Sequence, residues 1–236
     1  MEGLPDDPAA RVGAAAASGG GVLSRRLVLW RHGRTEWNAT GRIQGQLNPP
    51  LDFVGRQQAV RAAMALSQLS PAVIVASDLE RAASTAYELS KRVEVTAHHD
   101  VRLREIGLGQ WEGLLREEVE ERFPGEFTSW MRGEDIRRGG GETYAEVGAR
   151  GAQCVLEAMD NPDGLVVAVT HGGTARSVIG VLLELDPASW WRLGPLGNCR
   201  WSVLIEGEHG WRLVEHNAGV PDVAVADEEH AGDDAR

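Results

Sequence analysis

Cysteine is scarce in this chain, and long apolar runs are missing from it. The 236 residues include only two cysteines, Cys154 and Cys199, which are too few for a disulfide framework. Such sparse cysteine fits the reducing cytoplasm. No stretch reaches the roughly 18 consecutive apolar residues that a membrane-spanning helix needs. The composition therefore predicts a cytoplasmic protein without a membrane partner.

Positive charge is also in deficit. Lys and Arg together number 24 against 35 acidic residues, which gives a formal net charge of -11. Proteins that bind nucleic acid carry a basic stripe that neutralises the phosphate backbone, and this sequence offers none. We therefore expect no nucleic-acid partner.

The two ends of the chain differ in composition from its middle. Residues 1–24 are rich in Ala and Gly and lack the basic start and continuous apolar core of a signal peptide. Acidic residues crowd the stretch 218–236. We expect a disordered leader over 1–24 and an acidic disordered tail over 218–236. Residues 25–217 then form a single domain of ordinary size.

Apolar runs alternate with helical patterns through this domain. Strands are predicted at 27–31, 73–76, 93–96, 165–169, 200–205 and 211–215. Helices are predicted at 52–69 with Asp52 as cap, after a cap at Ser77 and Asp78, at 142–159 and at 174–185. The alternation predicts an α/β fold. We expect a three-layer sandwich with a mostly parallel central sheet and helices on both faces.

Side chains that can carry chemistry follow three of these strands. Arg31 and His32 end the first strand, Arg81 lies in the first turn after the second, and His171 follows the strand 165–169. Each residue alone reads as a polar turn or a surface cation. Together they are expected at the carboxyl edge of the sheet, where α/β folds bind ligands. Arginine matches a phosphate bidentately and neutral imidazole attacks phosphorus, so the pattern favours a phosphate site.

The stretches 27–35 and 166–174 echo each other. Each runs from an apolar strand into His-Gly and, after one further residue, into Thr. If the two strands are neighbours in the sheet, their imidazoles meet at one edge. Gly33, Gly172 and Gly173 would then allow backbone N–H groups and a helix amino end to approach an anion closely.

Four motifs occur in order along the chain: Arg31-His32-Gly33, Ser-Asp-Leu-Glu-Arg-Ala at 77–82, Leu-Arg-Glu-Ile at 103–106, and His171-Gly172. Together they resemble the histidine phosphatase superfamily, which includes cofactor-dependent phosphoglycerate mutases and many phosphatases. The resemblance spans about residues 25–217 and implies the phosphoglycerate mutase-like fold. It also implies phosphoryl transfer through a phosphohistidine, without a metal and without a resident cofactor.

The resemblance implies a role for each matching residue. His32 is the implied nucleophile, Arg31, Arg81 and His171 surround the phosphate, and Glu105 gives a proton to the leaving oxygen. Without the motif around it, Glu105 would read as an exposed loop acid. Contacts to the substrate are implied for Gly33, Thr35, Asn38, Gln44, Gly45 and Gly172.

The implied nucleophile must be neutral in order to attack. Flanking guanidinium groups from Arg31 and Arg81 disfavour an imidazolium and lower the pKa of His32. The second ring nitrogen then needs a hydrogen-bond acceptor that fixes the tautomer. The sequence offers no specific candidate for this acceptor.

Residues 103–113 resemble the phosphatase branch and lack the Asn-Glu-Arg-x-Tyr-Gly-like stretch that mutases usually carry around the acid. The implied activity is hydrolysis of a small phosphorylated metabolite. Mutase-type phosphoryl transfer and a non-catalytic phospho-ligand binder are the alternatives.

The runs 42–47 and 191–198, with Trp201, are similar to the actinobacterial branch that acts on glucosyl-3-phosphoglycerate. The resemblance implies this ester, with other sugar, glycerate or nucleoside phosphates such as α-ribazole phosphate left open. We expect residues 106–141 to be an insertion that covers the substrate. Its Trp111, Trp130, Arg132, Arg137 and Arg138 either contact the substrate or serve packing and solvation. Apolar residues near Trp190 and Trp191 leave a homodimer open.

Overall fold

The central sheet organises the computed structural model, which describes residues 25–160 and 164–221. Its six strands lie in the order β3-β2-β4-β1-β5-β6. They are β1 (Arg26–Arg31), β2 (Val73–Ala76), β3 (Ala97–His99), β4 (Leu165–Thr170), β5 (Trp201–Gly207) and β6 (Gly210–Ala218). The pairs β1–β4, β2–β4 and β2–β3 are parallel, whereas β5 runs antiparallel to both β1 and β6. The expected mostly parallel sheet is confirmed.

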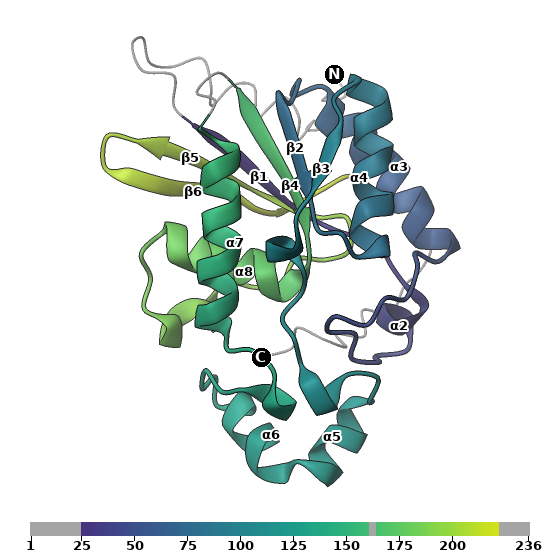
Figure 1. Cartoon of the computed structure of the whole chain (residues 1–236), viewed down its shortest axis with the longest axis vertical. Helices are drawn as coiled ribbons and strands as arrows, with labels where there is room; N and C mark the ends of the chain where they lie inside the picture. The colour runs from purple at the N-terminus through teal and green to yellow at the C-terminus, as the bar shows by residue number, and fades with distance from the viewer. Residues whose placement is uncertain (1–24, 161–163, 222–236) are drawn as a thin grey trace, which may run out of the picture.

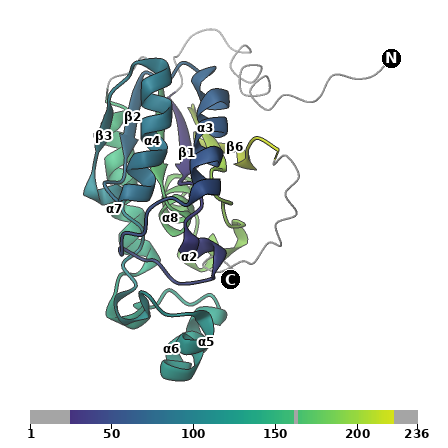
Figure 2. The ribbon, with the colours of Figure 1, turned by 90° about the vertical axis from the view of Figure 1, so that its right-hand side faces the viewer.

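Helices cover both faces of this sheet (Figures 1 and 2). On one face lie α3 (Phe53–Ser67) and α4 (Glu80–Val93), and on the other lie α7 (Tyr144–Ala158) and α8 (Gly172–Leu182). Side chains of β1 alternate between the two cores, because successive strand residues point to opposite faces. Val28 and Trp30 pack with α3 and α4, while Leu27 and Leu29 pack with α7 and α8. The expected three-layer α/β sandwich is confirmed.

A third apolar cluster lies outside the sandwich, in the segment 106–141 that we call the cap. The cap contains η2 (Gly109–Trp111), α5 (Arg116–Arg122), α6 (Pro124–Met131) and η3 (Arg138–Gly140). Its core forms around Trp111, Phe127 and Trp130, and the ring of Trp130 makes T-shaped contacts with the other two. Figure 1 shows α5 and α6 below the carboxyl end of the sheet, at the far end of the molecule from the start of β1. The short elements α2 (Glu36–Ala39), η1 (Val101–Leu103) and η4 (Pro187–Arg192) lie in the remaining connections.

Several element boundaries differ from the expectations. The strand expected at 93–96 is wrong: Val93 ends α4, Glu94 adopts a left-handed φ of 55°, and β3 begins only at Ala97. The cap expected at Ser77 and Asp78 is also wrong, since Leu79 is the N-cap of α4 and makes no side-chain cap bond. The carboxylate of Asp78 instead accepts a 2.7 Å bond from Arg104.

Two further boundaries shift. Helix α8 begins at Gly172, two residues before the expected start at 174. Strand β6 includes Ala218, and Val220 packs against the core, so the ordered domain passes the expected end at 217. The leader expected at 1–24 and residues 222–236 of the expected tail lie outside the described residues. Within the described ranges, no helix has the length and apolar character to cross a membrane.

The packing of α3 against the sheet can be tested directly by substitutions on its buried and exposed faces. Leu66 is fully buried in α3, whereas Met64 of the same helix is 54% exposed. We expect Leu66→Ala to lower the free energy of unfolding by about 2–5 kcal/mol, because it leaves a cavity. Met64→Ala should change it by less than about 0.5 kcal/mol. Urea unfolding of both variants measures the difference, and equal effects would contradict the described packing.

Candidate active site

The parallel pairing of β1 and β4 brings two histidines together. Arg31 is paired with Thr170 at the last position of the two strands, so His32 and His171 leave the sheet side by side. The backbone N–H of His32 donates to the carbonyl oxygen of Thr170 at 3.0 Å. The two rings have centroids 5.1 Å apart and planes inclined by 60°. Both side chains are buried.

Arg81 joins this pair from α4. Strand β2 neighbours β4, and α4 follows β2, so the first turn of α4 starts at the same sheet edge. The fully buried Arg81 donates from Nε to Nδ1 of His171 at 3.2 Å. Its two terminal nitrogens donate to the carbonyl oxygens of Gly45 and Leu47 at 2.7 Å each. Arg81 therefore ties the loop before α3 to the histidine pair.

Arg31 reaches the same region from the end of β1. Its side chain is almost fully buried and donates to the carbonyl oxygen of Leu196, in the segment that precedes β5. Carbonyl acceptors orient a guanidinium group without cancelling its charge. The expected convergence of Arg31, His32, Arg81 and His171 is thus present as geometry.

A backbone carbonyl fixes the tautomer of His32. Nδ1 of His32 lies 2.7 Å from the carbonyl oxygen of Gly33. A carbonyl oxygen only accepts, so Nδ1 carries the proton and Nε2 keeps its lone pair. The acceptor that the sequence left unidentified is therefore the residue next in the chain.

Burial keeps both imidazoles neutral. Burial lowers the pKa of His32 well below its usual range, and the charges of Arg81 and Arg31 lower it further. Burial likewise lowers the pKa of His171, with Arg81 as the next cause. Desolvation and a nearby positive charge both disfavour the imidazolium, so the two causes act in the same direction.

Ser77 holds the second nitrogen of His171. Since Nδ1 of His171 accepts from Arg81, Nε2 carries the proton and donates to Oγ of Ser77 at 2.8 Å. Sequence reasoning assigned Ser77 to a helix cap and missed this contact. The contact could have been predicted from the position of Ser77 directly after β2, because β2 is the strand next to β4 and His171 follows β4.

Glu105 lies at the amino end of α8. Its carboxylate accepts from the N–H groups of Gly173 and Thr174 at 3.2 and 3.0 Å, and from that of Ile106 at 2.9 Å. The hydroxyl of Thr174 lies 3.2 Å from the same carboxylate. A Cβ at Gly173 would come within 2.8 Å of Oε1, so only glycine lets Glu105 reach the helix end. Glu105 is buried, so the exposed loop acid is excluded.

The loop after β1 forms a polar network. The hydroxyl of Thr35 lies 3.0 Å from Oε1 of Gln44 and 3.1 Å from Oδ1 of Asn38. Asn198 donates to Oδ1 of Asn38 and to the carbonyl oxygen of His32, both at 3.2 Å. Asn198 was not among the expected site residues, because its contacts come from a segment 166 residues away in the chain.

Gly33 allows close packing of the backbone and does not present its N–H group to an anion. Its N–H donates to Oγ1 of Thr85 at 3.1 Å, and a Cβ would come within 2.4 Å of the Gly55 carbonyl oxygen. The expected direct anion contact of the Gly33 amide therefore does not fit this arrangement. Gly172, in contrast, is the first residue of α8, where helix N–H groups point toward the site.

The sequence model described as Histidine phosphatase superfamily (branch 1) matches residues 27–219. The chain belongs to the histidine phosphatase superfamily. The glucosyl-3-phosphoglycerate phosphatase of Mycobacterium tuberculosis is 40% identical over 192 residues, which cover 78% of this chain and 86% of that protein. Phosphoserine phosphatase 1 of Hydrogenobacter thermophilus is 34% identical over 181 residues, with 76% and 85% covered.

A solved structure agrees with these relatives. Mycobacterial glucosyl-3-phosphoglycerate phosphatase in complex with VO3 matches with a TM-score of 0.78 at 40% identity, covering 83% of this chain and all of that one (100%). The expected family, fold and phosphatase class are confirmed. The histidine phosphatase described here is a phosphoric monoester hydrolase.

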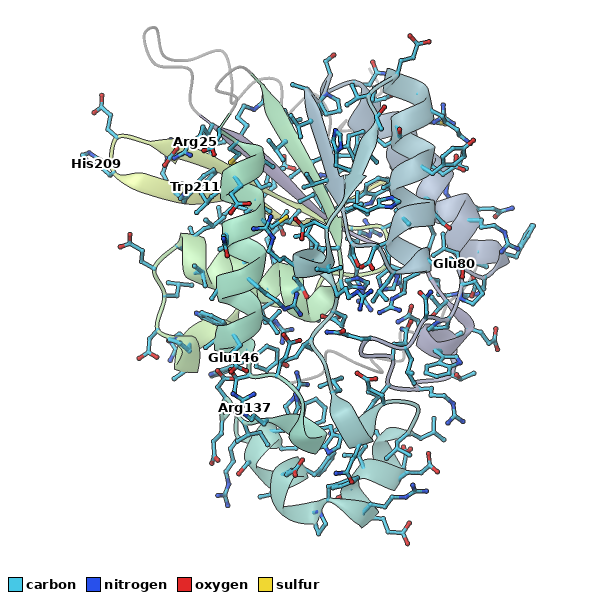
Figure 3. All side chains as sticks on the ribbon, viewed as in Figure 1. Arg25, Glu80, Arg137, Glu146, His209 and Trp211 are labelled. Carbon is cyan, nitrogen blue, oxygen red and sulfur yellow. The ribbon has the colours of Figure 1, made fainter. Side chains whose placement is uncertain are left out.

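The cap residues named from the sequence have different environments. Trp111 is buried inside the cap, and Arg132 is an exposed residue 4.0 Å from Glu134. Arg137 pairs with Glu146 at the start of α7, and Figure 3 shows the two side chains beside each other. Arg138 is buried and stacks on Trp130 and Tyr144.

The neutral histidines predict how stability depends on pH. The unfolded histidines take up protons near pH 6.5, whereas the buried ones resist protonation, so stability is complete above about pH 6.5 and falls below it. Each histidine contributes up to about 1.4 kcal/mol per pH unit to this loss. We expect His32→Asn to flatten the decline between about pH 6.5 and about pH 5.

Urea unfolding at several pH values measures this slope. The exposed His98 provides the matched control, because His98→Asn should keep the slope of the unaltered protein. An unchanged slope in His32→Asn would show that His32 is not held neutral.

Proposed function

We propose that His32 attacks the phosphorus of a phosphate monoester through Nε2. The lone pair on Nε2 carries this proposal, and it is supported by the bond between Nδ1 and the Gly33 carbonyl oxygen. The Nε2–P bond forms while the P–O ester bond breaks, and a phosphohistidine remains. A water molecule then attacks phosphorus, the N–P bond breaks, and inorganic phosphate and neutral His32 are released.

Arg31, Arg81 and His171 are proposed to bind the nonbridging phosphate oxygens. Phosphoryl transfer places negative charge on these oxygens, and the fixed positive charges of Arg31 and Arg81 stabilise it without reorganisation. The neutral His171 takes part as an N–H donor, in exchange for its bond to Ser77. The bonds from Arg81 to Gly45, Leu47 and His171 support this role, because they hold the guanidinium in one position. Thr35, Asn38, Gln44, Gly45 and Gly172 are proposed to line the same pocket.

Glu105 is proposed as the proton carrier. It gives its proton to the leaving oxygen in the first step and takes one from the attacking water in the second. Its place at the amino end of α8 supports this role, since the same helix begins directly after His171.

We propose a sugar or glycerate phosphate as substrate, with glucosyl-3-phosphoglycerate as the specific candidate. The supporting observation is the 40% identity to the enzyme that bears this name in Mycobacterium tuberculosis. A panel of phosphorylated metabolites tests this choice. Isomerisation of phosphoglycerate with a bisphosphate primer would favour the mutase alternative instead.

We propose a cytoplasmic enzyme, in keeping with two cysteines that are both buried free thiols. A homodimer near Trp190 and Trp191 stays a prediction. Its apolar surface is smaller than expected, because Trp190 is buried and only Trp191 is half exposed.

Removal of the nucleophile tests the reaction. We expect His32→Asn to lower kcat/KM for phenyl phosphate by at least about 10³-fold, because the variant lacks the Nε2 lone pair that the proposed attack on phosphorus needs. Excess chelator should leave the unaltered enzyme active. His98→Asn, at an exposed site, serves as control. Retained turnover in His32→Asn, or its loss in chelator, would refute the proposed chemistry.

Replacement of Glu105 tests the proton transfer. Glu105→Gln should cost about 10²- to 10⁴-fold on alkyl phosphates, whose leaving oxygen needs a proton. The loss should be much smaller on p-nitrophenyl phosphate, whose leaving group departs as a stable anion. Glu117→Gln, at an exposed position of α5, is the control. Equal losses on both substrates would mean that Glu105 acts in some other way.

A further inference from the structure

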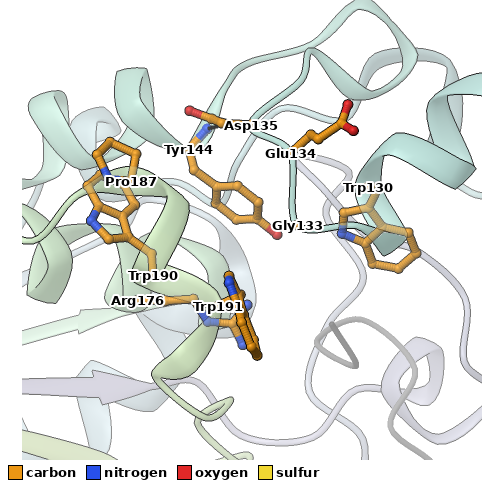
Figure 4. A pocket seen from close by; sticks show the side chains of 9 residues that line it. All are labelled: Trp130, Gly133, Glu134, Asp135, Tyr144, Arg176, Pro187, Trp190 and Trp191. Atoms are coloured by element: carbon orange, nitrogen blue, oxygen red, sulfur yellow. Dashed lines mark hydrogen bonds between the residues drawn. The ribbon is translucent and has the colours of Figure 1, made fainter.

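A cleft lies between the cap and the helices α7, α8 and η4 (Figure 4). The cap contributes Trp130, Gly133, Glu134 and Asp135, and the body contributes Tyr144, Arg176, Pro187, Trp190 and Trp191. Four of these nine residues are aromatic, and Figure 4 shows Tyr144 between the Trp130 side and the Arg176 side. This composition suits an organic group of modest size.

Arg176 is the buried cation of this cleft. Its side chain is only 7% exposed, and its Nε has no hydrogen-bond partner. Within residues 25–160 and 164–221, no hydrogen bond or ion pair to its guanidinium group is found. Arginine stays charged in proteins, and a buried charge without a partner is unfavourable. An anion bound in the cleft would pair with this charge.

The two acidic residues of the cleft do not provide that anion. Asp135 caps α7, where its carboxylate accepts from the N–H groups of Tyr144 and Ala145 at 2.6 and 3.0 Å. Glu134 has a side chain that is 49% exposed and lies 4.0 Å from Arg132. Arg138, the other buried arginine nearby, also has no hydrogen-bond partner at Nε and Nη2, but its guanidinium lies over the rings of Tyr144 at 4.5 Å and Trp130 at 5.8 Å.

Arg176 is also close to the proposed phosphate site along the chain. It follows Gly172, the first residue of α8, by four positions, which corresponds to an axial rise of about 6 Å. Side chains on a helix lean toward its amino end, and here that end bears His171 and Glu105. A ligand that touches both Arg176 and His32 would thus place its phosphate at the histidines and its remainder in the cleft.

We propose that the cleft receives the leaving group of the substrate and that Arg176 binds a carboxylate on that group. This inference rests on the proposed function, because it places the phosphate at His32. A carboxylate matches the planar guanidinium bidentately, and the aromatic walls exclude water and strengthen the pair. The enzyme therefore selects phosphate esters that carry a carboxylate a few bonds away from the phosphate.

Matched substrates test this selection. 3-Phosphoglycerate and glycerol 3-phosphate differ in a carboxylate, as do phosphoserine and phosphoethanolamine. The unaltered enzyme should prefer the carboxylate member of each pair. Arg176→Gln should lower the ratio of kcat/KM values within each pair by about 10- to 100-fold, mainly through KM of the carboxylate member. Arg176→Lys should restore part of the preference, because lysine keeps the positive charge but lacks the planar guanidinium group that binds a carboxylate bidentately.

Arg132→Gln is the matched control, since Arg132 belongs to the cap and is exposed. It should keep the full preference. Glycerate should also inhibit hydrolysis of phenyl phosphate by the unaltered enzyme more strongly than glycerol does, which tests the site without any variant. Thermal unfolding of Arg176→Gln should show no loss of stability, because the substitution removes a buried charge that has no partner.

Three results would overturn the assignment of Arg176. They are the absence of a carboxylate preference in the unaltered enzyme, an undiminished preference in Arg176→Gln, and an equal loss on both members of each pair. Failure of the proposed function looks different, because phenyl phosphate would then be hydrolysed at the same rate by His32→Asn and by the unaltered protein.

Discussion

The parallel, in-register pairing of β1 with β4 is the constraint on which the site depends. It places the last residues of the two strands opposite each other, so that the next residue of each is a histidine at the same edge. A shift of register by one residue would turn one of the side chains to the other face of the sheet. The buried strands β1 and β4 fix this register because each presents apolar residues to both helical layers.

The polar contacts around the histidines preserve positive charge while they fix geometry. Arg81 and Arg31 donate to the carbonyl oxygens of Gly45, Leu47 and Leu196, and His32 donates to that of Gly33. These acceptors are uncharged, so they orient the groups without neutralising them. Burial then gives the charges a strong effect on an anion and keeps the imidazoles neutral. The same burial that stabilises the fold thus keeps His32 in the neutral form that the proposed attack requires.

Helix α8 connects the parts of the enzyme that would act on different portions of a substrate. Its N-cap is His171, its first turn binds Glu105, and Arg176 follows in the cleft below the cap. Because an α-helix is rigid over such a distance, these groups keep a fixed spacing. Variation of the cap could therefore change the leaving group that is accepted, while the chemistry at the amino end of α8 stays the same.

The sequence by itself determined the layers of the fold and the placement of Arg31, His32, Arg81 and His171 at one edge of the sheet, because strand patterns and the residues that end them are local signals. Long-range contacts were decided only by the tertiary structure. Ser77 as the partner of His171, Gly33 as the acceptor for His32 and the packing of Gly33 on Gly55 all depend on where distant backbone segments meet. The sequence likewise does not reveal that Nε of Arg176 lacks a hydrogen-bond partner, because this depends on which groups surround it in the folded chain. The periodic pattern of apolar residues determines which face of a helix or strand is buried. Only the folded chain determines which hydrogen-bond partners a buried polar atom has.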